Sequence, residues 1–292
     1  MKSVVVGVNG SVRSEAAARW AATVAGQAGA RLTQIGVTGS NRGVASLRPF
    51  PVPVAMSEAA PAASQSLLVG GSPGPTLVAE AVGHDADLVV VGSGQPHGVE
   101  GVTHRGVADY LARHLRRPLA LVPAGTGSGP VRHLVVGVGG GDGDHAALQR
   151  VAALARAIDA DVVVAHAFHR PLEFWVHADA RSQWAKERRV LTGLWTEPLR
   201  AAGVLRDIVM VDCDDPAQVI DDVATSSGAD AMVVGDGRSR PFMLAGGASV
   251  SSRLRRLHLR CPLVQVPSRV DGDGAPASPA PASEDRTGTA AR

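Results

Sequence analysis

Two glycine-bearing segments are the residues of this chain best suited to meet a charged ligand with their backbone. Residues 88–94 read LVVVGSG and residues 231–237 read AMVVGDG, so the glycines fall at matched positions after apolar runs. Glycine allows close approach of the backbone, and neighbouring N–H groups can then close on phosphate oxygens. The match between the two segments also indicates that one unit occurs twice.

A third glycine-rich segment is weaker evidence for a binding site than the first two. Residues 137–143 read GVGGGDG, which partly fits a dinucleotide-binding loop, but the third glycine of that pattern is replaced by Asp142. No suitable acidic partner follows a second strand, as the pattern requires. The repeat already explains this segment.

Other groups capable of chemistry do not form a catalytic or metal-binding set. His97 with His104, and His166 with His169, have no Cys, Asp or Glu on the same element to complete a metal site, so we expect ordinary surface or loop histidines. Cys261 precedes Pro262 before a strand and is expected to be a buried structural thiol. We therefore predict no catalytic residue and no metal ligand. The acidic residues near the second glycine segment are expected at a helix start and on its exposed turns, where they complement the helix dipole: Asp212, Asp214, Asp215, Asp221 and Asp222.

Arginines crowd one region near the carboxyl end of the chain. Arg253, Arg255, Arg256 and Arg260 could meet an acidic partner or RNA, but a solvated helix face is the commoner arrangement. The formal net charge is only +2 and the other arginines are scattered through the chain. Nucleic acid is therefore an unexpected partner.

Alternating strands and helices must position these residues. Apolar runs of strand length alternate with helical patterns throughout, which predicts right-handed crossovers and parallel sheets covered by helices on both faces. The expected strands are 3–8, 32–38, 66–69, 88–91, 119–122, 134–138, 161–167, 208–211, 232–234 and 263–266, and the expected helices are 14–28, 75–82, 145–158, 179–202 and 216–225. Residues 179–202 carry Trp184 and Trp195, expected in the core, and Pro198, expected to kink the helix.

The repeat and the length both predict two compact domains. The chain has 292 residues, 45% hydrophobic and only 3% aromatic, so Val, Leu, Ile and Ala must build the core. We expect domains at 1–124 and 131–267, a linker at 125–130 (GTGSGP) and a disordered tail at 268–292. The proline-rich residues 39–65 are expected to form a loop.

The same sequence features favour a cytoplasmic protein. The two cysteines build no disulfide framework, no leader with a cleavage site opens the chain, and no apolar run reaches membrane-spanning length. We expect no membrane partner.

The chain resembles a tandem universal stress protein. The resemblance is carried by VVVGVNGS after the first strand, by residues 71–94 (GSPGPTLVAEAVGHDADLVVVGSG) and by residues 214–237 (DDPAQVIDDVATSSGADAMVVGDG). It implies two five-stranded parallel sheets of the adenine nucleotide alpha hydrolase type, with a ligand edge at the switch point between the first and fourth strands. It also implies an internal pseudo-dimer of the two copies, for which we expect the fifth strands, 119–122 and 263–266, to be the meeting edges.

The resemblance also implies where ATP or another adenine nucleotide would bind. The family pattern of Gly-x-x-Gly, nine residues, then Gly-Ser or Gly-Thr falls here on Gly92, Gln95, Arg105 and Gly106, and on Gly235, Arg238, Ala248 and Ser249. An acidic residue after the first strand and a residue of the second strand would hold ribose and adenine. These positions read Asn9 and Val37 in the first copy, and Gly139 and Ala167 in the second. The predicted binding residues are Asn9, Val37, Gly92, Gly94, Arg105, Gly106, Gly235, Gly237, Arg238, Ser249 and Val250.

Both copies depart from that pattern. Gln95 and Arg238 place side chains where backbone should approach phosphate, and Gly139 offers no side chain at all. Arg105 and Arg238 could instead bind phosphate through their guanidinium groups, or a smaller anion could bind there. The sequence thus predicts a non-catalytic stress-response regulatory module with partly degenerate nucleotide pockets. A nucleotide-free scaffold for an unknown protein partner, and a slow ATPase, are the alternatives.

Overall fold

The computed structural model describes residues 1–38, 64–93, 106–139, 142–168, 180–213, 215–236, 249–257 and 259–267. The described strands are β1 (Ser3–Val8), β2 (Arg31–Thr38), β3 (Ser64–Gly70), β4 (Leu88–Gly92), β5 (Leu119–Val122), β6 (His133–Gly137), β7 (Asp161–Phe168), β8 (Leu205–Asp212), β9 (Ala231–Gly235) and β10 (Leu263–Val266). The described helices are α1 (Val12–Ala28), α2 (Pro73–Gly83), α3 (Val107–His114), α4 (Asp142–Ile158), α5 (Ala180–Val190), η5 (Leu191–Trp195), α6 (Glu197–Ala201), α7 (Pro216–Ser226) and α8 (Val250–Leu254).

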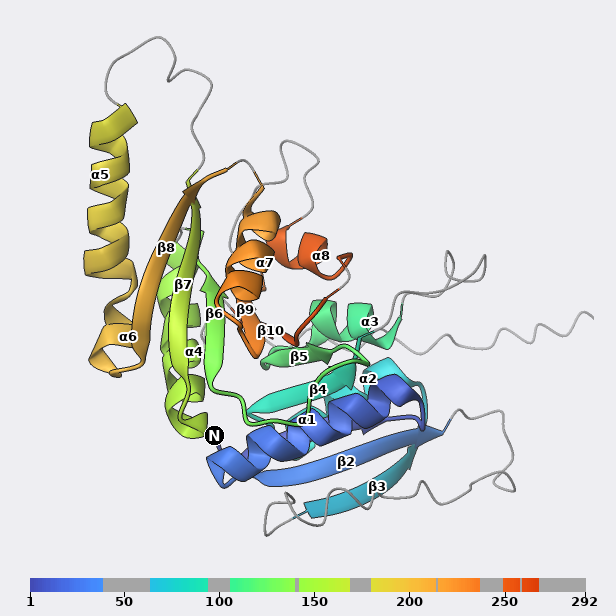
Figure 1. Ribbon diagram of the computed structural model, residues 1–292. Helices are drawn as coiled ribbons and strands as arrows, with labels where there is room; N and C mark the ends of the chain where they lie inside the picture. The colour runs from blue at the N-terminus through green and yellow to red at the C-terminus, as the bar shows by residue number, and fades with distance from the viewer. Residues whose placement is uncertain are drawn as a thin grey trace, which may run out of the picture.

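All ten described strands belong to one sheet, in the order β3-β2-β1-β4-β5-β10-β9-β6-β7-β8 (Figure 1). Each half contributes five parallel strands, and the halves join where β5 and β10 pair antiparallel, with Ala120 opposite Val264. This confirms the predicted α/β fold and the expected meeting of the fifth strands.

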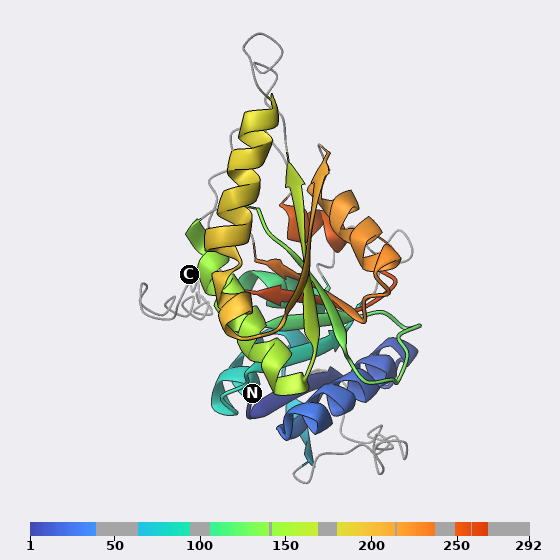
Figure 2. The same ribbon diagram turned by 60° about the vertical axis from the view of Figure 1, so that its left-hand side comes forward.

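Helices cover both faces of the sheet. Figure 2 shows the strands of the second half between α4 and α5 on one side and α7 on the other. One buried cluster joins α1 and α4 to one face of the strands, and a second joins α2, α3, α7 and α8 to the other. Strands such as β1 and β4 are buried on both faces, which explains why they read as continuous runs of valine.

The two halves repeat local details of packing. Gly7 in β1 and Gly137 in β6 occupy equivalent positions, and a β-carbon at either would collide with a helix side chain. The colliding side chains are Leu77 of α2 and Ile220 of α7, which are themselves equivalent. Glycine leaves room for these side chains at both positions, so each helix lies close to the sheet.

The helix expected over residues 179–202 is broken into three parts. It begins within the described residues at Ala180, passes through the π-helical turn η5, and continues as α6, in which Pro198 lies in the first turn. Proline lacks an N–H and is accepted at the start of a helix, so the break falls before Pro198. Trp184 and Trp195 are half-buried at the edge of the core, less buried than predicted. Trp184 packs edge-on against Phe168, with ring centroids 5.2 Å apart.

Some expectations fall on residues that the structure does not describe. The tail at 268–292 lies outside the described residues, as does the proline-rich segment except for Ser64 and Gln65, which belong to β3. Residues 125–130 are described and connect β5 to β6 without helix or strand.

Side chains tie the two halves together beyond the sheet. Gln27 near the end of α1 donates to the carbonyls of Val131 and Ile158, at 3.0 and 2.8 Å, and accepts from the Val131 N–H at 2.9 Å. Arg255 after α8 pairs with Asp109 of α3 at 3.6 Å. Burial lowers the pKa of the Arg255 guanidinium, and Asp109 partly offsets that effect. The expectation of a solvated arginine face is therefore wrong for Arg255, because the partner half covers it.

We predict that Gln27→Ala lowers the free energy of unfolding by about 2 kcal/mol, because three hydrogen bonds between the halves lose their partner. Gln218→Ala is the matched control, since Gln218 is exposed and its side chain donates to Asp222 one turn further along α7. Its cost should stay within about 0.5 kcal/mol. Urea unfolding followed by circular dichroism measures both, and equal costs for the two variants would contradict the role assigned to Gln27.

Candidate functional site

The carboxyl ends of β2, β1 and β4 bring the first-half candidates to one edge of the sheet. Val8 of β1 lies opposite Gly36 of β2, so Asn9 and Val37 follow on neighbouring strands. β1 also pairs with β4, which ends at Gly92. The connections leave β1 and β4 in opposite directions along the sheet order, so this edge is a topological switch point. Open α/β sheets bind their ligands at such an edge.

The side chain of Asn9 is already engaged by the loop that it begins. Its Oδ1 accepts from the Ser11 N–H at 3.2 Å and from the Ser11 hydroxyl at 2.7 Å. The Asn9 N–H donates to the Ser14 hydroxyl at 3.3 Å, and Ser11 in turn caps α1 by accepting from the Ser14 N–H. The loop is thus held against the first turn of α1 by its own polar groups.

Gly92 is required by packing before any ligand is considered. A β-carbon there would lie 2.7 Å from the carbonyl carbon of Arg13, in the first turn of α1. Backbone cannot move aside as a flexible side chain can, so β4 ends in glycine because α1 crosses it there. Gly106 differs, because it precedes α3 without a side-chain cap and a β-carbon there would meet no atom within 4 Å.

The second half places its candidates at the equivalent edge, where β6, β7 and β9 end. Gly137 lies opposite Ala165 of β7 and Val234 of β9, so Gly139, Ala167 and Gly235 lie close along this edge. The Gly139 N–H donates to the Asp144 carboxylate at 3.0 Å, which repeats the contact between Asn9 and Ser14.

The last second-half candidates stand at the start of α8. The Ser249 hydroxyl accepts from the Ser252 N–H at 3.2 Å and so caps its own helix. Val250 packs against the core behind it.

Four predicted binding residues lie outside the described residues: Gly94, Arg105, Gly237 and Arg238. Gln95 and Ala248 also lie outside the described residues. In each predicted site the structure therefore describes the residues at the strand ends and the residue just before the next helix, which is Gly106 in the first half and Ser249 in the second.

A buried histidine lies beside the carboxyl ends of the second-half strands, and the sequence did not predict its contacts. His166 of β7 is 2% exposed and lies neither on the surface nor in a loop, so that expectation is wrong. Its Nδ1 bonds the Val138 carbonyl at 2.8 Å, and its Nε2 bonds Glu187 Oε1 of α5 at 2.9 Å. Both partners are acceptors when Glu187 is ionised, and a neutral imidazole has one N–H.

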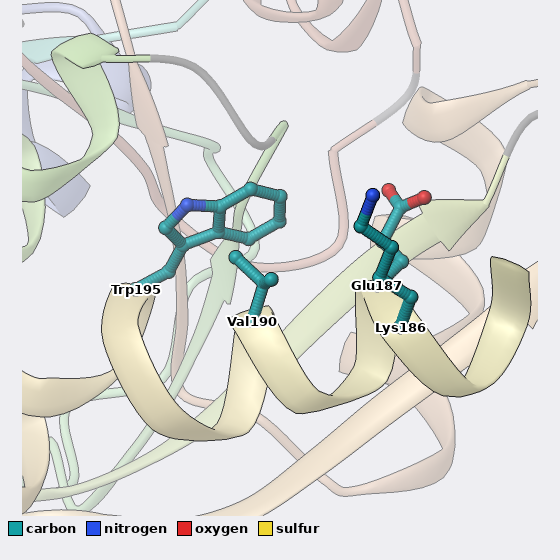
Figure 3. Close-up of a pocket in the computed structure, with 4 residues that line it drawn as sticks. All are labelled: Lys186, Glu187, Val190 and Trp195. Carbon is teal, nitrogen blue, oxygen red and sulfur yellow. The ribbon is translucent and has the colours of Figure 1, made fainter.

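An open cavity of about 290 Å³ lies on the flank of α5 and η5 next to this pair. Figure 3 shows its four lining side chains, Lys186, Glu187, Val190 and Trp195, on one side of the helical segment. Trp195 also lies tilted against His166, with ring centroids 5.8 Å apart. Glu187 links the cavity to the buried ring. The sequence pointed to His166 only as a possible partner of His169, because its contact with Glu187 joins a strand to a helix 21 residues away.

Cys261 is a thiol held in its neutral form. Burial, with a smaller effect of Asp221, raises its pKa to about 11. A neutral thiol is a poor nucleophile and metal ligand, which agrees with the structural role predicted for it. Among the described residues no three His, Cys, Asp or Glu side chains gather as a metal site.

The fold defines a tandem α/β protein with a topological switch point in each half. The model of the family described as "Universal stress protein family" matches residues 1–123 and, separately, residues 130–267. The chain belongs to the universal stress protein family, and it holds two copies of the family's unit.

Two solved structures that align with most of this chain support the same fold. A universal stress protein from Archaeoglobus fulgidus DSM 4304 is 12% identical, with a TM-score of 0.65 over 91% of this chain and 96% of that chain. A putative universal stress protein from Pseudomonas aeruginosa UCBPP-PA14 is 17% identical, with a TM-score of 0.62 over 91% and 93%. A universal stress protein in complex with cAMP is 24% identical over 41% of this chain and 96% of that chain, with a TM-score of 0.36. The search of curated proteins gave no match.

No helix within the described residues is both long and apolar enough to cross a bilayer.

We predict that Gly92→Ala lowers the free energy of unfolding by about 2 to 3 kcal/mol, because the added carbon collides with backbone of α1. Gly106→Ala is the control, since its β-carbon enters open space. Its effect should stay within about 0.5 kcal/mol. Thermal unfolding of both variants decides the point, and a Gly92→Ala protein as stable as the parent would remove the packing explanation.

His166→Ala should cost about 3 kcal/mol, because it removes a buried ring and two hydrogen bonds. Glu187→Gln retains an acceptor for Nε2 and should cost less. In a double-mutant cycle, His166→Ala and Glu187→Ala should be coupled by more than about 0.5 kcal/mol, whereas His166→Ala and Arg189→Ala should be additive. Additivity in the first pair would mean that the 2.9 Å contact contributes nothing to stability.

Proposed function

We propose that this chain is a non-catalytic regulatory protein of the stress response, built from units at 1–124 and 131–267, and that it binds an adenine nucleotide at the first-half edge. Support comes from membership of the family together with one geometric observation. Asn9, Val37 and Gly92 leave three neighbouring parallel strands at one switch point. This is where an open sheet offers backbone N–H groups and a concave edge to a nucleotide.

The first-half edge suits binding better than catalysis. Asn9 offers a carboxamide, which donates and accepts hydrogen bonds but does not titrate near neutral pH. General acid or base catalysis needs a group that exchanges a proton at the working pH. A slow ATPase would therefore have to take its catalytic group from elsewhere in the chain.

The second-half edge is proposed to be degenerate. Gly139 has no side chain to hold a ribose, and its N–H is already bonded to Asp144. Ser249 uses its hydroxyl to cap α8. We assign this half to the pseudo-dimer interface and to a protein partner, in a cytoplasmic protein whose described cysteines are free thiols.

A nucleotide-free scaffold is the second candidate function. It is favoured by the two hydrogen bonds that Ser11 already donates to Asn9 Oδ1. A ribose hydroxyl would have to compete with both. The contact between Ser11 and Asn9, and not the fold, would then limit the affinity of the first half for a nucleotide.

Calorimetry with ATP, ADP and AMP separates the two candidates. We predict one saturable site, and we predict that Asn9→Asp tightens it about tenfold, because a carboxylate accepts hydrogen bonds from ribose about twice as strongly. Asn9→Ala should weaken it. Gly139→Asp tests whether the second half can be restored in the same way.

Absence of heat at millimolar nucleotide in both the parent and Asn9→Asp would favour the scaffold. An unchanged nucleotide pool after long incubation would exclude the ATPase.

A further inference from the structure

A second cavity lies between the two halves, away from the carboxyl edges described above. Its volume is about 220 Å³, and it is bounded by the start of β4, the residues before β5, one side of α4 and the end of β10. The end of β10 reaches the start of β5 because the two strands are antiparallel, with Leu119 opposite Gln265. The cavity therefore exists only where both halves are joined.

Arginines surround this cavity. Arg116, Arg117 and Arg150 line it, whereas Asp87 is the acid in its wall. Asp87 Oδ2 already accepts from the backbone N–H groups of Lys2 and Ser3. That carboxylate is therefore occupied by the main chain.

The arginines retain donors that could face a ligand. Arg117 pairs with Asp85 at 2.8 Å, but the Asp85 side chain is 87% exposed. Arg150 donates from one nitrogen to the Pro267 carbonyl at 2.6 Å, and a guanidinium has five N–H donors. Within the described part of the chain, neither Arg116 nor Arg150 forms an ion pair. The cavity thus carries an excess of positive charge.

The rest of the cavity wall is apolar. Leu88, Pro118, Leu154 and Val266 contribute its surface beneath the arginines. Arginine next to an apolar wall is suited to a ligand with an anionic head and a small hydrophobic body.

The equivalent place in the other half is filled. α1 and α4 are both 17 residues long, and the ninth residue is Trp20 in α1 and Arg150 in α4. Trp20 is 4% exposed and packs in the core, while its Nε1 has no partner among the described residues. Val24 is 1% exposed, whereas its counterpart Leu154 is only half-buried.

The exchange of tryptophan for arginine accounts for the open cavity. A buried tryptophan fills a large volume, and its unpaired N–H shows that it is placed there for packing. Arginine at the same position leaves that volume open and adds a charge. One half has thus kept a packed core where the other has a basic cavity.

We propose that this cavity is a binding site for a small amphiphilic anion, a phosphate or carboxylate carried on a compact apolar group. Arg116 and Arg150 hold the anionic head, and Leu154 and Val266 contact the apolar body. The site is separate from the nucleotide edge, and its existence does not depend on the proposed function.

Phenyl phosphate is the probe, titrated into the full chain and followed by amide chemical shifts in NMR. We expect saturable binding with a dissociation constant of about 1 mM or below, as expected for a fragment of this size. The shifts should centre on Leu154 and Val266. Phenol and inorganic phosphate, each with half of the chemistry, should bind at least about tenfold more weakly.

Arg150→Trp installs the residue that the first half carries, and it should abolish binding by filling the cavity. Arg116→Gln changes an exposed side chain, so the variant should fold like the parent. It should weaken binding of phenyl phosphate about tenfold. Arg156→Gln removes a charge from the same helix outside the cavity and should change nothing.

Four outcomes of these titrations would overturn the proposal. They are no saturation with phenyl phosphate, equal binding of inorganic phosphate, unchanged affinity in both Arg150→Trp and Arg116→Gln, or an equal loss in Arg156→Gln. Saturating AMP should leave the affinity unchanged, and displacement by AMP would contradict a separate site. If AMP itself fails to bind, the nucleotide function fails while this titration still decides the cavity.

Discussion

The antiparallel pairing of β5 with β10 is the constraint on which the arrangement of both halves depends. Each half alone would end in an exposed edge strand, since β5 and β10 lie last in their own strand orders. Unpaired strand edges invite association, and in this chain the partner is supplied by covalent linkage. Ala120 and Val264, opposite each other at this seam, are both buried. The seam therefore supplies both backbone hydrogen bonds and a continuous core.

Pairing at this seam also determines where polar groups can act. It brings α1 next to the start of the second half, so that Gln27 can satisfy Val131. It also brings α3 near the end of α8, so that Asp109 meets Arg255. Neither contact is visible in the sequence of one half, because each depends on the register between two strands far apart in the chain.

Much of the fold could be predicted because its signals are local. Valine runs marked β1, β4 and β9, and proline near the helix starts marked α2 and α7, so those elements lie within a few residues of where we expected them. The candidate site was less accessible. A resemblance could name Asn9 as a ligand position, but only coordinates show that Ser11 already occupies its oxygen. His166 sits among apolar residues of β7, where periodicity identifies a buried position without indicating its partner on α5.

The loops after β1 and β6 show how two halves can keep the same fold while their candidate binding side chains differ. In both halves a loop N–H bonds a side chain of the following helix, Asn9 to Ser14 and Gly139 to Asp144. This contact stabilises the loop whether or not a ligand is present, so selection for the fold preserves it. The side chain at the loop's first position differs between the halves: Asn9 has a carboxamide that could meet a nucleotide, whereas Gly139 has no side chain.

The two halves are thus free to diverge wherever packing does not fix the residue. Gly7 and Gly137 are the same residue type, and each lies beneath a side chain of the helix that covers it, Leu77 or Ile220. Trp20 and Arg150 differ although they occupy equivalent positions in helices of equal length. In a symmetric dimer of identical chains both positions would have to change together, so a cavity opened on one side would also open on the other. Fusion removes that coupling, because each half has its own codon for the position, and one half can retain a packed core while the other becomes a basic cavity.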